Sequence, residues 1–134
     1  MGYAIGGREI GRALDKVRPH FGVNAMGQAG ALAALEDAAH LQSVIAATHA
    51  GRQQLAQIAG EAGLPPRFGW TNFVLMDAGS KESADALLDR LLRAGVFVRK
   101  PGQPPLDRFI RVSVGRAEEN ALFSEILRSY GKAV

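Results

Sequence analysis

The sequence predicts an α/β (α+β) fold in which a three-stranded sheet carries helices on one face. Apolar residues recur at helical spacing in several long segments and follow a two-residue alternation in shorter ones. From residue 38 onward, the expected elements run helix, strand, helix, strand, strand, helix. Helices packed on one face of a small sheet would bury the apolar surfaces of such a set.

The first 37 residues are expected to form a short strand followed by two helices. Residues 2–5 are apolar and stand before two glycines, so they resemble a short strand. Residues 8–18 have apolar positions at helical spacing, and Pro19 ends that helix. Asn24 is a suitable N-cap for a second helix over residues 25–37.

The elements of the sheet are expected after a long helix over about residues 39–62, which Gly63 ends. Large apolar residues alternate along residues 67–77, as they do in a strand. The remaining elements are a helix capped by Ser80 and ended by Gly95, strands over 96–99 and 109–114, and a final helix after Gly115.

Composition excludes several classes of protein. The chain has no cysteine, which excludes disulfides, thiolate metal sites and a cysteine nucleophile and suits a cytoplasmic location. No apolar run is long enough to span a membrane, so no membrane partner is expected. The net charge is only +3 and the basic residues are scattered, so nucleic acid is not an expected partner. His40 and His49 would lie on opposite helix faces, and no metal site is expected.

Three polar residues stand out in the predicted strands. Arg99 and Arg111 have apolar neighbours, and two adjacent strands could point both guanidinium groups at one carboxylate or phosphate. Spacing leaves open a second interpretation, in which each arginine forms an ordinary surface ion pair. Asn72, in the middle of a strand, could orient a ligand or satisfy a backbone group.

Several short segments, taken together and in order, resemble the C-terminal portion of a class I/II aminotransferase. These enzymes depend on pyridoxal 5'-phosphate (PLP) and have fold type I, and the histidinol-phosphate aminotransferase branch is the most similar. The segments are 2–6 (G-Y-A-I-G), 15–24 (D-K-V-R-P-H-F-G-V-N), 33–37 (A-A-L-E-D), 71–75 (T-N-F-V-L), 95–99 (G-V-F-V-R), 110–115 (I-R-V-S-V-G) and 118–120 (E-E-N).

The resemblance implies a domain organisation and substrate-binding residues. Residues 1–37 would be a remnant of the large PLP-binding domain with its linking helix, and residues 38–134 would be the small C-terminal domain. Arg111 would grip the acidic group of the substrate, Arg99 would be the second arginine, used for phosphate, and Asn72 would lie near the pocket. The substrate would be an amino acid or amino phosphate.

The resemblance also implies that residues needed for catalysis lie outside this chain. In the family, the Schiff-base lysine precedes the "G-Y-A" strand, so Met1 would correspond to an internal position of a longer enzyme. The lysines here do not match that motif; they are Lys16, Lys81, Lys100 and Lys132. We therefore expect no catalytic, cofactor-binding or metal-binding residue here. PLP would bind in the complete enzyme, and this chain alone would bind none and be inactive.

The first 37 residues also predict a protein partner. Their apolar side chains would lack the sheet and domain that cover them in the family, so a homodimer is expected. The contact would be centred on Tyr3, Ile5, Ile10, Leu14 and Met26. An alternative function is a non-enzymatic module that binds an anionic small molecule or a partner chain.

Overall fold

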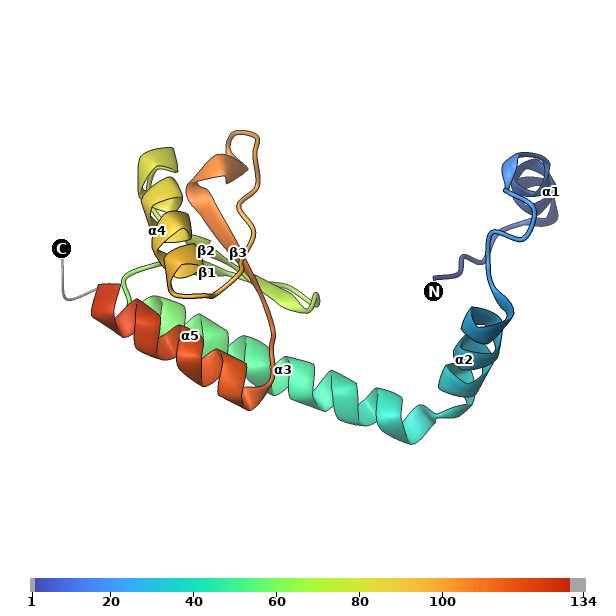
Figure 1. The fold of residues 1–134 in the computed structure, drawn as a ribbon, viewed down its shortest axis with the longest axis horizontal. Coiled ribbons are helices and arrows are strands. Elements are labelled where there is room, and N and C mark those ends of the chain that lie inside the picture. Colours follow the sequence, from blue (N-terminus) through green and yellow to red (C-terminus); the bar gives the residue numbers. More distant parts are fainter. Residues whose placement is uncertain (1, 131–134) are drawn as a thin grey trace. The chain divides into compact units, whose positions relative to one another are not determined.

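The computed structural model describes residues 2–130, which divide into two compact units between Ser43 and Val44. The division falls inside the long helix α3 (Ala38–Glu61) (Figure 1). The predicted boundary between residues 37 and 38 stays a prediction. No helix within residues 2–130 is long and apolar enough to cross a membrane.

The first unit contains α1 (Arg8–Val17) and α2 (Ala25–Glu36), as the sequence predicts. The Asn24 side chain caps α2 by accepting a hydrogen bond of 2.7 Å from the Gly27 N–H. The strand predicted over residues 2–5 is wrong, because this segment pairs with no described strand. Neither α1 nor α2 buries a side chain, and the predicted dimer contact on this apolar surface stays a prediction.

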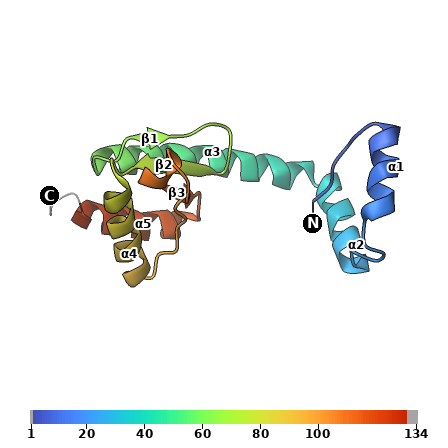
Figure 2. The same cartoon turned by 90° about the horizontal axis from the view of Figure 1, so that it is seen from above.

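The second unit is built on a three-stranded antiparallel sheet with the order β1-β2-β3. Helices α3 and α5 run beside each other, joined by a hydrogen bond from Asn120 to Gln54 (Figures 1 and 2). The elements after α3 are β1 (Pro66–Arg67), β2 (Phe73–Asp77), α4 (Lys81–Arg93), the 3-10 helix η1 (Leu106–Arg108), β3 (Phe109–Ser113) and α5 (Ala117–Tyr130).

The helices cover one face of this sheet, as predicted. Alternate residues of β2 and β3 are buried against apolar side chains of α3, α4 and α5. The buried strand residues are Val74, Met76, Ile110 and Val112. The residues between them, among them Leu75 and Arg111, are only partly buried and form the other face, here called the open face.

The segment predicted as one strand over residues 67–77 is divided in two. Residues 68–72 bend and are exposed, and β1 folds back to pair antiparallel with β2. Gly69 lowers the preference of this segment for extended structure. Alternation of apolar side chains continues through the bend, so the pattern gives no sign of the turn.

The strand predicted over residues 96–99 is also wrong, because only Arg99 pairs with the sheet, through a bridge to Arg111. Gly95, at φ 78°, turns the chain after α4. Pro101 follows two residues after Arg99, and proline has no N–H with which to extend a ladder. The segment therefore pairs with the edge of the sheet at one residue.

Candidate anion-binding site

A row of side chains crosses the open face of the sheet. Arg67 pairs with Leu75, Leu75 with Arg111, and Arg111 with Arg99. Directly paired residues of antiparallel strands place their side chains on the same face. The row therefore carries three arginines, and the two neighbours at its end, Arg99 and Arg111, are here called the arginine pair.

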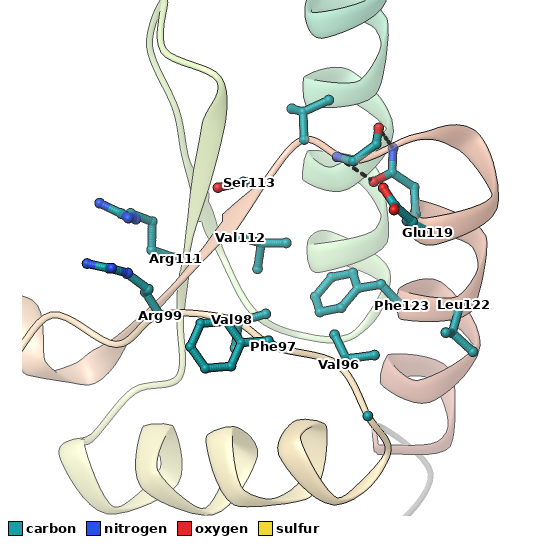
Figure 3. A pocket seen from close by; sticks show the side chains of 14 residues that line it. Val96, Phe97, Val98, Arg99, Arg111, Val112, Ser113, Glu119, Leu122 and Phe123 are labelled. Carbon is teal, nitrogen blue, oxygen red and sulfur yellow. Dashed lines mark hydrogen bonds between the residues drawn. The ribbon is translucent and has the colours of Figure 1, made fainter. Parts of the chain in front are cut away.

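The backbone fixes the spacing of the arginine pair. The Arg99 N–H donates to the Arg111 carbonyl at 3.1 Å, and the Arg111 N–H donates to the Arg99 carbonyl at 2.6 Å. Residues that exchange both bonds have Cα atoms about 5.5 Å apart. The two guanidinium groups extend side by side in the same direction, away from Val96 and Phe123 (Figure 3). The sequence-based prediction of their common direction is confirmed.

Neither member of the arginine pair has a carboxylate partner within residues 2–130. The guanidinium carbon of Arg111 lies 5.1 Å from the centre of the Phe73 ring, and its Nε is buried without a hydrogen-bond partner among the described residues. Like charges directly opposite each other are unfavourable in a sheet. An anion beside the two guanidinium groups would relieve this repulsion.

The nearby carboxylate on the open face, Asp77, is already occupied. Arg108 Nε and Nη2 donate to its two oxygens at 2.7 and 2.6 Å. These hydrogen bonds are the main cause that lowers the pKa of Asp77. Asp77 therefore pairs with Arg108 and does not neutralise the charge of the arginine pair.

A cavity of about 570 Å³ adjoins the arginine pair. It lies between residues 95–99, the end of β3 and the start of α5, and much of its lining is apolar, including Phe97, Leu122 and Phe123 (Figure 3). At its other end, Asn120 Oδ1 accepts a hydrogen bond of 3.2 Å from the Gly115 N–H. Arg99 and Arg111 thus contribute to one end of the cavity lining, and their guanidinium groups extend away from its apolar part (Figure 3).

Asn72 lies immediately before β2 and is exposed. Its backbone carbonyl accepts a hydrogen bond of 2.8 Å from the Val114 N–H, which ties it to the end of β3. Among the described residues, no hydrogen bond links its side chain to the arginine pair. The structure thus brings Arg99 and Arg111 together, whereas Asn72 makes no hydrogen bond with them among the described residues.

Arg52 is a residue of this region that the sequence-based analysis missed. Its side chain is 7% exposed, and its Nη1 donates to the Thr71 carbonyl at 2.8 Å. It therefore holds the bend that contains Asn72. The sequence did indicate that Arg52 would be buried, because it stands three residues before the apolar Leu55 and so lies on the same face of α3.

The two described lysines of this unit form ion pairs with a carboxylate outside the arginine pair. Lys81 and Lys100 both bind Asp85, on α4, at 2.7 and 2.6 Å. Lys16 belongs to the other unit, and Lys132 lies outside the described residues. Within residues 2–130, no group of three His, Asp or Glu side chains could hold a metal ion.

The chain is similar in sequence to known aminotransferases. Residues 1–127 match the family model described as aminotransferase class I and II. The chain is 39% identical to histidinol-phosphate aminotransferase 1 of Nitrosococcus oceani, over 96% of this chain and 34% of the relative. It is 45% identical to histidinol-phosphate aminotransferase 2 of Methylococcus capsulatus, over 92% of this chain and 33% of the relative.

A solved structure is similar in fold as well as in sequence. The crystal structure of histidinol-phosphate aminotransferase from Sinorhizobium meliloti, in complex with pyridoxal-5'-phosphate, matches with a TM-score of 0.81 and 41% identity. The match covers 88% of this chain and 34% of that one. The chain thus spans about a third of the length of the relatives that it matches.

Proposed function

Because the chain belongs to the class I and II aminotransferases, we propose that it forms the substrate-recognition part of a PLP-dependent aminotransferase of the histidinol-phosphate type. The similar proteins that carry that name support the choice of branch. The observation that carries the proposal is the arginine pair, which has no carboxylate partner within residues 2–130. Its ligand would be the phosphate or carboxylate of the substrate.

The geometry of the arginine pair suits a tetrahedral dianion. Two parallel guanidinium groups present several N–H donors to one position, and charge-assisted hydrogen bonds of this kind are stronger than neutral ones. Arg111 is held by the Phe73 ring and by its backbone pairing, so little of its freedom is lost on binding. Arg99 is more exposed than Arg111, and its guanidinium group would donate further hydrogen bonds to the same anion. Asn72 would lie near the pocket.

The cofactor does not fit a site made of the described residues alone. PLP enzymes hold the cofactor on a lysine amine that faces the reacting groups. Lys81 and Lys100 instead form ion pairs with Asp85. We therefore propose that the lysine and the cofactor phosphate site belong to the remaining part of a complete enzyme. This chain alone would then bind substrate without catalysing its transamination.

Titration with matched ligands tests the proposal. The chain, with no PLP added, should bind histidinol phosphate and inorganic phosphate, whereas histidinol should bind at least about tenfold more weakly than histidinol phosphate because it lacks the charge-assisted contacts. Isothermal calorimetry or NMR titration gives the three dissociation constants. Equal affinity for histidinol and histidinol phosphate would contradict the proposal, and so would the absence of binding by both phosphates.

A further inference from the structure

The chain after Arg99 has no regular structure to hold it in place. Arg99 is paired with the sheet only through its bridge to Arg111. Residues 100–105 after it form no helix or strand and contain three prolines and a glycine. The side chain of Arg99 is exposed. Before Arg99, the buried Val98 holds the chain against the core. After Arg99, only a further anchor would stop the chain from turning and moving the guanidinium group away from Arg111.

The next residue supplies an anchor. The Lys100 side chain is only 13% exposed, and its Nζ lies 2.6 Å from Asp85 Oδ1. The same Nζ donates to the Asp107 carbonyl at 3.2 Å, in η1, which packs against α4. Lys100 therefore connects the loop after Arg99 to a helix on the covered side of the sheet.

The direction of Lys100 determines the direction of Arg99. Successive side chains of an extended segment point to opposite faces. Since Val98 before it is buried in the core and Lys100 after it is held towards α4, Arg99 points towards the open face, beside Arg111 (Figure 3). From this geometry, we propose that Asp85 and Lys100 are positioning residues, which orient Arg99 for binding of the substrate anion. This proposal rests on the function proposed above.

Lys81 offers a matched control. It also binds Asp85, at 2.7 Å, and it carries the same charge as Lys100. However, Lys81 lies on α4 itself, four residues before Asp85, so its ion pair spans one turn of the helix and holds no other segment. Loss of Lys81 removes a positive charge near Asp85 and leaves the anchor of the loop in place.

Electrostatics and positioning predict opposite effects for Asp85→Asn. This substitution removes a negative charge near the site, so long-range attraction alone would strengthen the binding of an anion. Loss of the anchor would weaken it. We expect Asp85→Asn and Lys100→Met each to raise the dissociation constant for inorganic phosphate by about threefold, and Lys81→Met to change it by less than about 1.5-fold.

Two measurements on the 134-residue chain test this. NMR titration with inorganic phosphate gives the dissociation constants of the native chain and the three variants. Nitrogen relaxation at the Arg99 Nε, without phosphate, reports how well its side chain is ordered. We expect lower order in Asp85→Asn and Lys100→Met, with the native value in Lys81→Met. Far-UV circular dichroism checks that each variant is folded.

The outcomes separate this inference from the proposed function. The positioning role would be overturned if Asp85→Asn bound phosphate as tightly as the native chain or more tightly. It would also be overturned if Lys81→Met weakened phosphate binding as much as Lys100→Met does. Unchanged Arg99 order in Asp85→Asn would also overturn it. If the native chain bound no phosphate but Arg99 lost order in Asp85→Asn, the positioning would stand and the anion-binding function would fail.

Discussion

Replacing Arg111 with alanine should weaken the binding of phosphate to this chain by about 10- to 100-fold, the effect expected when charged hydrogen bonds to a ligand are lost. Arg111 is the better held member of the arginine pair, since its guanidinium group lies against Phe73 and its backbone is part of β3. Its Nε is buried without a hydrogen-bond partner among the described residues. Alanine removes the N–H donors of the guanidinium group, and it breaks no ion pair, because Arg111 forms none within residues 2–130.

A dissociation constant measured by calorimetry checks this prediction, with Arg93→Ala as the control. Arg93 is exposed at the end of α4 and pairs with Asp89 on its own helix, so its loss should leave phosphate affinity within about twofold of native. In a complete enzyme, Arg111→Ala should raise KM for the phosphorylated substrate far more than it alters PLP binding. Equal losses in the two variants would show that net charge, and not this site, binds the anion.

Replacing Gly51 with alanine should lower the free energy of unfolding by about 1 to 3 kcal/mol, the usual cost of overpacking. Gly51 is buried in α3, where a Cβ atom would overlap Cγ1 of Val114 and lie 3.5 Å from Asn120 Nδ2. Val114 follows β3 and Asn120 holds the start of α5, so neither can move without disturbing the end of the cavity. The clash outweighs the gain in helix propensity.

Gly60 provides the matched comparison within the same helix. It is exposed in the last turn of α3, and a Cβ atom there would meet nothing within 4 Å. Gly60→Ala should therefore raise the free energy of unfolding by up to about 1 kcal/mol. Urea unfolding of both variants gives the two values. A stabilised Gly51→Ala would show that α3 and β3 are packed less closely than the structure indicates.

The helices were predictable from the sequence because local signals determine where they begin and end. Asn24 and Ser80 cap α2 and α4 through side-chain hydrogen bonds from nearby N–H groups. Gly63 and Gly95 follow α3 and α4 at positive φ, which glycine adopts without strain. Each of these residues acts within a few positions of its own place in the chain.

The strands were less predictable because pairing depends on residues far apart in the sequence. Residues 96–99 have the composition of a strand, but they pair with the sheet only at Arg99. The division between β1 and β2 is held by a contact from Arg52, nineteen residues before Thr71. A pattern of apolar residues carries no information about such partners.

Apolar neighbours in two predicted strands made a common direction of Arg99 and Arg111 possible, but spacing alone left open an ordinary surface ion pair for each. The family resemblance decided in favour of a shared anion site. What the sequence could not give was the anchor. The contact between Lys100 and Asp85 joins segments fifteen positions apart, and Asp85 resembles any other solvent-facing carboxylate on a helix. The ion pair that commits Asp77 to Arg108, and so leaves the arginine pair without a carboxylate, was equally hidden.

The central claim is that Arg99 and Arg111 form an anion receptor. It is tested most directly by soaking a crystal of the chain in selenate and solving its structure. Selenate is a tetrahedral dianion whose anomalous scattering locates it without ambiguity. We expect a peak between the two guanidinium groups, with selenate oxygens about 2.7 to 3.0 Å from nitrogens of both residues. Selenate bound only elsewhere, with Arg99 and Arg111 free of it, would contradict the claim.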